Sequence, residues 1–242
     1  MSQAEFDPYA DRYHDLLASS IASSGETHEY FAAYKIRDLA ELWQGSRGAS
    51  MHVPPKILDF GSGIGTSVPH LLRCFPGSAI TCADVSRRSL DLAQSKLLSA
   101  ASFVHFSGTH LPFPDGKFDL AFAACVFHHI PHREHSALLK ELGRVIRGGG
   151  MLVLYEHNPL NPLVRRAVAS CPFDEDAVLI PAWKLRQCVA AAGFVGTRSA
   201  YRVFFPRRAR ALRFMERGLS WLPLGAQYYV VGMKATSKSC GP

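Results

Sequence analysis

A glycine-rich turn with a carboxylate before it is the first stretch of the chain whose residues could do chemistry. Gly61, Gly63 and Gly65 closely follow an apolar run that contains Asp59. Such a turn between a strand and a helix lets a ligand approach the backbone, and the start of the helix offers unpaired N–H groups. A second carboxylate, Asp84, follows 23 residues after Gly61. That spacing is close to the one at which an acid binds ribose hydroxyls in doubly wound folds.

The two carboxylates restrict the chemistry of the ligand. An anion beside Asp59 would be repelled, whereas an amino group would be attracted. The glycine spacing is G-x-G-x-G, with Thr66 where a dinucleotide fingerprint has its third glycine, and this weakens the pyrophosphate interpretation. The pattern favours a ligand with a cationic end, a ribose and no phosphate. Three structural alternatives stay open: Asp59 or Asp84 could cap the helix that follows it, and the turn could serve the fold alone.

Apolar runs alternate with amphipathic segments around this turn. We expect strands that begin at residues 56, 79, 102, 118 and 150, and helices from about Thr66, at 87–101 and at 133–146. Because the strands are apolar throughout, they predict a parallel sheet that is covered on both faces. The glycines at 148–150 predict the stop of the third of these helices, before the fifth strand.

The segments at the two ends of the chain complete the predicted fold. Two helices are expected at 7–19 and 27–43, before the first strand. After the fifth strand we expect a helix near 181–192, a strand at 193–205, a basic helix near 207–219 and a final strand at 226–234. We do not expect the last two strands to form a direct hairpin, because a helix lies between them.

Four motifs, taken together, carry a resemblance to a known family. They are ILDFGSGIG, CADVS, LPFPDGKFDLAFAACVFHHIPH and LLKELGRVIRGGGMLVLYE, in this order between residues 56 and 156. The set resembles the successive motifs of class I methyltransferases that use S-adenosylmethionine. The resemblance implies an α/β, Rossmann-like, doubly wound fold with a mostly parallel seven-stranded sheet and an N-terminal helical lid. It implies a single methyltransferase domain over 1–242, with the lid at 1–45, the cofactor-binding core at 52–156, and the substrate side and C-terminal strands at 157–242.

The resemblance also implies roles for individual residues toward S-adenosylmethionine. The residues implied to contact the methionine moiety, or to support the backbone behind it, are Asp59, Gly61, Ser62 and Gly63. Asp84 would accept hydrogen bonds from both ribose hydroxyls. The residues implied near the adenine and the sulfonium are Val85, Ser107, Gly108, Thr109 and Ala124, with Ser107 standing where many relatives have aspartate. Tyr13, together with Tyr9, would close the lid on the cofactor, or else pack against the sheet.

The acceptor side is predicted from the chemistry of the methyl group. A sulfonium methyl is already electrophilic, so such an enzyme must mainly align the acceptor and exclude water. Groups that face the acceptor must lie at the carboxyl edge of the sheet. We predict this position for His129, which follows the fourth strand, and for Glu156 and His157 at the end of the fifth. Structural capping by the pair His128–His129 stays open.

Metal and nucleic-acid chemistry are not predicted. His128, His129, His132 and His135 could share a helical face, but Pro131 interrupts it and only Glu134 would add a carboxylate there, so no metal site is expected. The motif HNPLNP at 157–162 is similar to a loop of nucleic-acid amino-methyltransferases, but it follows the fifth strand instead of the fourth and lacks the aromatic residue. We therefore expect a small-molecule or lipid-linked acceptor and no nucleic acid.

Charge is concentrated in one segment. The chain has a net charge of +7, and residues 202–217 hold six arginines against one glutamate. This segment could be a solvated helix face, or a basic amphipathic element that makes weak contact with a membrane surface.

The length and composition limit the kinds of protein that this chain can be. With 242 residues, 48% of them apolar, one substantial core is expected. No run reaches the roughly eighteen apolar residues of a membrane span, and the N-terminal residues are acidic and polar, unlike a secretory signal. The six cysteines form no CxxC pair, which predicts reduced thiols. We expect a soluble cytoplasmic protein, and the sequence does not indicate its oligomeric state.

The sequence thus predicts transfer of a methyl group from S-adenosylmethionine to an oxygen, nitrogen or carbon atom of the acceptor. Two alternatives remain open: an NAD-dependent oxidoreductase, and a noncatalytic module that binds an adenosyl ligand.

Overall fold

The computed structural model describes residues 7, 21, 24–47, 53–171, 174 and 176–236. The helix expected at 7–19 lies outside the described residues, except for Asp7. The predicted lid residues Tyr9 and Tyr13 are therefore outside them as well. Asp7 itself lies at the carboxyl end of the second strand, where its carboxylate accepts a hydrogen bond from Ser86 Oγ (2.6 Å).

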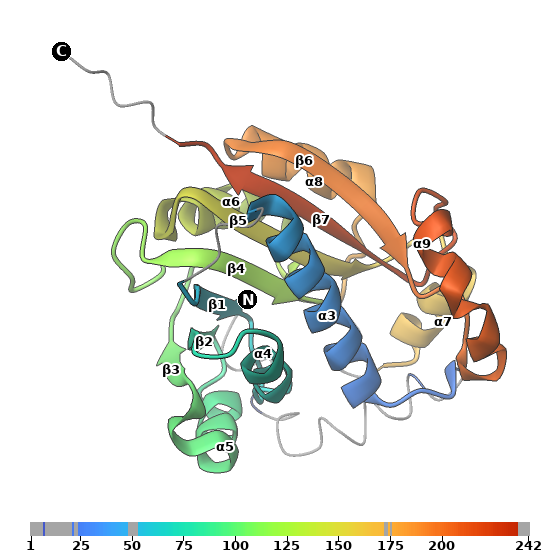
Figure 1. Cartoon of the computed structure of the whole chain (residues 1–242), viewed down its shortest axis with the longest axis horizontal. Coiled ribbons are helices and arrows are strands. Elements are labelled where there is room, and N and C mark those ends of the chain that lie inside the picture. Colours follow the sequence, from blue (N-terminus) through green and yellow to red (C-terminus); the bar gives the residue numbers. More distant parts are fainter. Residues whose placement is uncertain are drawn as a thin grey trace.

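The described residues form one seven-stranded sheet in the order β3-β2-β1-β4-β5-β7-β6 (Figure 1). The strands β1 to β5 are parallel to their neighbours, and β7 is antiparallel to β5 and β6. The predicted α/β, mostly parallel fold is confirmed. The strands are β1 (Lys56–Phe60), β2 (Ala79–Asp84), β3 (Ser102–His105), β4 (Phe118–Ala124), β5 (Ile146–His157), β6 (Phe194–Arg202) and β7 (Gln227–Lys234).

The strands β6 and β7 pair with each other, although no direct hairpin joins them. They are antiparallel neighbours, with Phe194 opposite Lys234 and Arg202 opposite Gln227. The chain between them forms η6 (Arg207–Met215) and α9 (Glu216–Leu219) beside the end of the sheet and then returns (Figure 1). A helical connection does not prevent pairing, since it only adds a modest entropic cost for closing a longer loop.

The glycines at 148–150 lie inside β5, so they are not the helix stop that the sequence predicted. The helix before them already ends at Val145. Gly150 stands in the irregular part of the β4–β5 ladder, where the register shifts. A Cβ atom on Gly150 would lie 2.5 Å from Ile146 Cγ2 and 2.8 Å from Asp119 O, so close packing of the backbone requires a glycine there.

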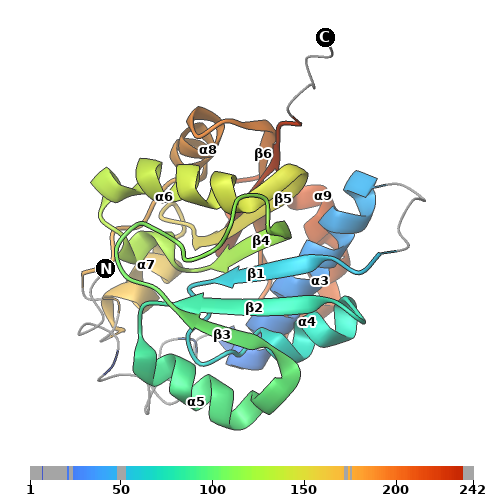
Figure 2. The same cartoon turned by 90° about the vertical axis from the view of Figure 1, so that its left-hand side faces the viewer.

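Helices cover both faces of the sheet (Figure 2). One hydrophobic core joins the sheet to residues of α6 and α8, and the other joins it to residues of α3 and α4. The helix α7 was not expected from the sequence; Asn161 caps its N-terminus and Pro162 begins it. The helices are α3 (His28–Arg47), α4 (Val68–Cys74), α5 (Arg87–Leu97), α6 (His132–Val145), α7 (Pro162–Ala169) and α8 (Ala182–Ala191), with short 3-10 turns at η3 (Leu98–Ala100) and η4 (Phe127–His129).

The helix α3 lies in the region that was expected to be a lid, and it divides into two parts. Ile36, Leu39 and Trp43 are buried in the core against the sheet. Tyr155 Oη of β5 donates a hydrogen bond to Lys35 O (2.9 Å), which ties the middle of α3 to the sheet. The later turns of α3 are therefore a fixed layer of the fold, and only its first turns are placed to cover a ligand.

The motif HNPLNP anchors the loop that precedes β7. The buried Asn158 side chain donates to Pro223 O (3.1 Å) and Gly225 O (2.8 Å), and Asn161 Nδ2 donates to Leu224 O (2.8 Å). The two asparagines thus have a structural role at the end of the sheet.

Three of the arginines in 202–217 form ion pairs with acids on or near α3. Arg202 Nε lies 2.8 Å from Asp38 Oδ2, Arg213 lies 2.6 Å from Glu26, and Arg217 lies 2.7 Å from Glu41. This segment therefore packs its charges against the N-terminal half of the chain, and η6 contains no buried residue. Among the helices within the described ranges, none has both the length and the apolarity that are needed to cross a membrane.

Candidate active site

A cavity of about 480 Å³ lies at the carboxyl edge of the sheet. The turn after β1, the ends of β4 and β5, and η4 form its floor, and the first turns of α3, part of α7 and the segment 203–206 form other parts of its wall. Parallel strands place their carboxyl ends at one edge, where open α/β sheets bind ligands. The predicted site residues that line the cavity are Asp59, Gly61, Ser62, Gly63, Asp84, Ala124, His129 and His157.

The glycine turn is fixed by hydrogen bonds to the end of β2. Gly61 N donates to Ala83 O (2.8 Å), and Gly63 N donates to Asp84 Oδ2 (2.7 Å). Gly61 has φ +70°, and a Cβ atom there would lie 2.5 Å from Val126 Cγ2. Gly63 has φ +52°, and a Cβ atom there would meet nothing within 4 Å, so its missing side chain leaves open space beside the backbone. The turn thus combines close packing on one side with access for a ligand on the other.

Asp84 accepts hydrogen bonds from the turn and is not a helix cap. Its Oδ1 accepts from Ser86 N (2.8 Å), while the cap of α5 is Ser86, whose Oγ accepts from Ser89 N (3.0 Å). Burial raises the pKa of Asp84, and backbone N–H donors oppose that rise. The carboxylate is therefore held rigidly at the cavity wall with lone pairs left for a ligand.

Asp59 is one of several polar groups in the cavity wall that are not fully hydrogen-bonded. It is 2% exposed, and its Oδ2 has no hydrogen-bond partner among the described residues. Burial and the nearby Asp84 carboxylate raise the pKa of Asp59 to about 8. It caps no helix, since α4 begins after Ser67. A buried carboxyl without a partner, facing a cavity, fits the amino group of a cationic ligand.

The predicted adenine-side residues Val85, Ser107, Gly108 and Thr109 do not line the cavity, whereas Ala124 does. Val85 is 3% exposed and does not line the cavity. Ser107 and Gly108 are exposed and Thr109 is half-buried, on the turn that follows β3. Phe106 N donates to Asp84 O (3.1 Å), which places this turn beside the end of β2. Their contacts with an adenine stay predictions.

Glu156 lies behind the cavity, which corrects the prediction that it faces the substrate. It is 1% exposed; its Oε1 accepts from Val126 N (3.0 Å) and Phe127 N (2.7 Å), and its Oε2 accepts from His128 Nδ1 (2.6 Å). The positive charge of His128 lowers the pKa of Glu156 against the effect of burial. Because both carboxylate oxygens are engaged, Glu156 is a positioning residue for η4 and His128.

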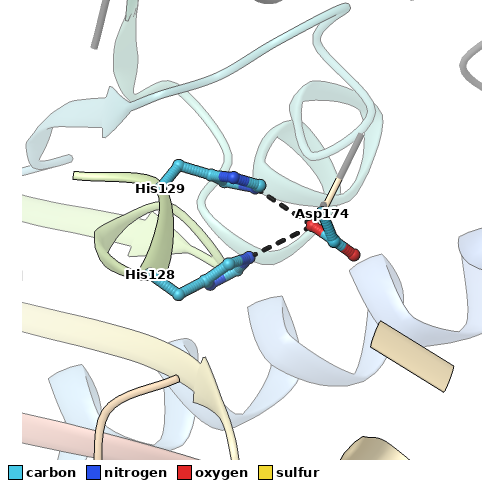
Figure 3. Close-up of side chains that lie close together, drawn as sticks. All are labelled: His128, His129 and Asp174. Carbon is cyan, nitrogen blue, oxygen red and sulfur yellow. Dashed lines mark ion pairs between the residues drawn. The ribbon is translucent and has the colours of Figure 1, made fainter. Parts of the chain in front are cut away.

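The two histidines after β4 converge on a third residue, Asp174 (Figure 3). His128 Nε2 lies 3.5 Å and His129 Nε2 lies 3.3 Å from Asp174 Oδ1. Burial acts to lower the pKa of His128, but Glu156 and Asp174 raise it to about 10. Burial and the charge of His128 lower the pKa of His129 to about 4. The pair is therefore more than a structural cap, because both imidazoles line the cavity.

The other two histidines of the sequence cluster do not join this group. His135 is buried, and its Nε2 donates to Phe127 O (3.0 Å) and Ile130 O (2.9 Å). His132 lies on the first turn of α6, with its ring 5.0 Å from that of His135. His135 thus holds the connection between η4 and α6.

Sequence reasoning missed many residues of the cavity wall, among them the polar residues Lys35, Cys125, Asp174 and Gln227. Cys125 follows β4 and has a backbone φ of +60°, which is uncommon for residues other than glycine and asparagine. Lys35 Nζ lies 3.3 Å from its sulfur. Lys35 lies on α3, Asp174 in the loop that follows α7, and Gln227 on β7. No local sequence pattern therefore connects these three residues with the motifs around β4.

Cys125 is expected to react with a small alkylating agent at neutral pH. Burial acts to raise the pKa of this thiol, but His157 and Lys35 lower it to about 6. The thiolate fraction therefore rises as the pH passes 6, and alkylation by iodoacetamide should follow with a midpoint near that value. Mass spectrometry of the labelled peptides between pH 5 and 9 checks the profile. A midpoint for Cys125 above 8, like that of an ordinary thiol, would contradict it.

Comparisons with known proteins agree with this geometry. Residues 57–150 match the family model described as a methyltransferase domain. The match includes the glycine turn, Asp84 and the two histidines after β4, so this part of the chain is similar to a methyltransferase domain. Its sequence is 34% identical over 104 residues to the methyltransferase GfsG of Streptomyces halstedii, covering 41% of this chain and 36% of that protein. It is 32% identical over 131 residues to a demethylmenaquinone methyltransferase of Clavibacter sepedonicus, covering 52% of each. The matches thus span about a third to a half of these relatives.

Solved structures show the same methyltransferase fold over nearly the whole chain. A methyltransferase of Thermotoga maritima, described as a possible histamine N-methyltransferase, has a TM-score of 0.62 at 17% identity and covers 96% of this chain and 99% of its own. A methyltransferase of Archaeoglobus fulgidus has a TM-score of 0.66 at 13% identity, with coverage of 86% and 95%. The methyltransferase fold therefore extends beyond the residues that the family model matches.

Proposed function

We propose that this chain transfers a methyl group from S-adenosylmethionine to an oxygen, nitrogen or carbon atom of a small-molecule or lipid-linked acceptor. One observation carries the proposal: Asp59, whose buried Oδ2 has no hydrogen-bond partner in the described part of the chain, and the fixed carboxylate of Asp84 line the same cavity as His129 and His157. A cofactor site and a set of polar groups for the acceptor thus share one cavity.

The residues present fit S-adenosylmethionine. Asp59 offers a carboxyl to an amino group, Asp84 offers acceptors to a ribose diol, and Gly63 leaves room for the ligand beside the backbone. When bound, S-adenosylmethionine supplies an electrophilic methyl group on a sulfonium. A nicotinamide dinucleotide fits less well, because its pyrophosphate would meet two carboxyl groups at the turn.

The acceptor end of the cavity combines polar groups with apolar walls. His129 and His157 offer ring nitrogens, and Lys35 and Cys125 lie beside them. Apolar side chains from α7 and from the segment before η6 line the wall: Leu163, Val164, Ala167, Val168, Val203 and Phe204. This combination suits an acceptor with a polar reacting end and an apolar body. The walls also exclude water from the reacting end, which favours methyl transfer over hydrolysis.

Calorimetry and a transfer assay test the proposal. S-adenosylhomocysteine is expected to bind the full chain and NAD is not. With S-adenosylmethionine labelled in its methyl group, a cell extract should yield a labelled small molecule in the presence of the wild type. Binding of NAD without binding of S-adenosylhomocysteine would favour the oxidoreductase. Binding of S-adenosylhomocysteine with no transfer to any acceptor would favour a noncatalytic module.

We further propose weak contact of residues 202–217 with an anionic membrane surface. Arg207, Arg208 and Arg210 are exposed, while the other three arginines of the segment pair with acids. Large apolar side chains stand beside them, with Phe214 80% and Trp221 74% exposed. Exposed aromatic and basic groups on one short segment are typical of elements that lie at a lipid surface.

Replacing Arg207, Arg208 and Arg210 with glutamine should reduce binding to anionic vesicles about a hundredfold, because each charge contributes about 1 kcal/mol near such a surface. Vesicle cosedimentation at low and high salt measures this. A matched variant removes three exposed charges elsewhere, with Lys96, Arg133 and Lys140 changed to glutamine. Equal binding of wild type and both variants would end the idea.

A further inference from the structure

The group of His128, His129 and Asp174 has the composition and the spacing of a metal site. The three ligand atoms lie within 4.8 Å of one another (Figure 3). An ion such as Zn²⁺ binds histidine nitrogen and carboxylate oxygen at about 2.0–2.2 Å, so a tetrahedral ion holds its ligand atoms about 3.3–3.5 Å apart. The two distances to Asp174 Oδ1 are 3.3 and 3.5 Å. Both match the edge of such a tetrahedron.

The same distances are long for hydrogen bonds. An N–H···O bond is most often about 2.7–3.2 Å long. Asp174 Oδ1 has no hydrogen-bond partner among the described residues, although Asp174 is only 8% exposed. The two imidazoles pair with this buried oxygen only at these longer distances. A bound cation between the three side chains would hold all three at ordinary coordination distances.

Glu156 supplies the outer support that a metal-binding histidine requires. His128 Nδ1 donates to Glu156 Oε2 (2.6 Å), which fixes the ring and leaves Nε2 directed to Asp174. Glu156 is itself held by two backbone N–H groups. A carboxylate that holds the second nitrogen of a ligand histidine is the usual arrangement around protein-bound zinc. Two buried carboxylates, Glu156 and Asp174, also balance the charge of a divalent ion.

We propose that His128, His129 and Asp174 bind a divalent first-row transition-metal ion in the wall of the cavity. Imidazole and carboxylate ligands suit Zn²⁺ and Fe²⁺ among these ions. Three protein ligands leave a fourth position, and the three residues all line the cavity. That position faces the acceptor space, so an oxygen or nitrogen of the acceptor would bind there. This consequence for the acceptor rests on the proposed function, whereas the metal site does not.

Calorimetric titration of the full chain with Zn²⁺, after treatment with a chelator, tests the site. One ion per chain is expected to bind to the wild type. Asp174→Asn and His129→Gln, which keep the size of each side chain, should each weaken binding at least a hundredfold. Glu156→Gln should weaken it about 10- to 100-fold through the orientation of His128. His132→Gln is the matched control, because it removes a neighbouring histidine outside the group.

Titration with Co²⁺ gives a second reading of the same site. The wild type and His132→Gln should show the visible absorption of a tetrahedral Co²⁺ centre, and Asp174→Asn should not. Absence of stoichiometric binding to the wild type, or equal binding by all variants, would overturn the proposal. Thermal melts confirm that each variant folds, and His129→Gln provides an independent test if Asp174→Asn does not.

Binding of S-adenosylhomocysteine to the metal-free protein separates this proposal from the proposed function. If Zn²⁺ binds and S-adenosylhomocysteine does not, the methyltransferase proposal fails and the metal site stands. If S-adenosylhomocysteine binds and Zn²⁺ does not, the metal site fails alone.

Discussion

Asp84→Ala is expected to weaken the binding of S-adenosylhomocysteine by at least a hundredfold. The carboxylate accepts from Gly63 N and Ser86 N and lines the cavity at the turn. We propose that its remaining lone pairs accept from the ribose hydroxyls. A hydrogen bond to a charged group contributes about 1.5–3 kcal/mol, so the loss of two corresponds to a hundredfold or more. Truncation also frees Gly63 N, which loosens the turn that must meet the ligand.

Calorimetry on Asp84→Ala and on Asp91→Ala separates this effect from the loss of a charge. Asp91 is an exposed acid on α5, close in sequence and not part of the cavity wall. The Asp91 variant should bind like the wild type. Asp84→Asn keeps the volume but presents a donor to ribose hydroxyls or backbone N–H groups, so it should bind nearly as weakly as the alanine variant. Wild-type affinity in either Asp84 variant would refute the assignment of the ribose site.

The cofactor half of the site could be predicted because its parts are local in sequence. Asp59, the glycine turn and Asp84 belong to one strand-turn-helix-strand unit, and the predicted starts of β1 and β2 agree with the structure. Short apolar runs bounded by turn residues locate such elements, since strands buried on both faces are apolar throughout.

The acceptor half depends on contacts between distant segments. Lys35 on α3, Asp174 after α7 and Gln227 on β7 meet at the cavity only through the order of the strands. That order includes the β6–β7 pair, which the sequence analysis did not predict. Glu156 illustrates the same limit: its place at the end of a strand is visible in the sequence, but its two backbone donors, which turn it away from the cavity, are not.

Asp59→Asn is expected to raise the stability of the unliganded protein and to lower its affinity for the cofactor. Burial and Asp84 raise the pKa of Asp59 to about 8, above the value of about 4 in an unfolded chain. A carboxyl of this kind stabilises the fold fully below about pH 4, and that contribution is lost as the pH rises toward 8. Asparagine resembles the protonated form at every pH. The variant should therefore unfold several degrees above the wild type at about pH 8, a difference of about 1–3 kcal/mol, and close to it at about pH 4.

Thermal melts with and without S-adenosylhomocysteine at both pH values measure the two effects together. The wild type should gain stability from the ligand at the higher pH, because an amino group beside Asp59 favours its ionised form. The variant lacks this charge pair, so the ligand should raise its melting temperature much less. Asp91→Asn is the control and should follow the wild type throughout. A variant that is less stable than the wild type without ligand, or equally stabilised by it, would show that Asp59 is a structural group. The stability of Asp59→Asn and its affinity for the cofactor are expected to change in opposite directions, because the buried carboxylate destabilises the unliganded fold and pairs with a cationic ligand.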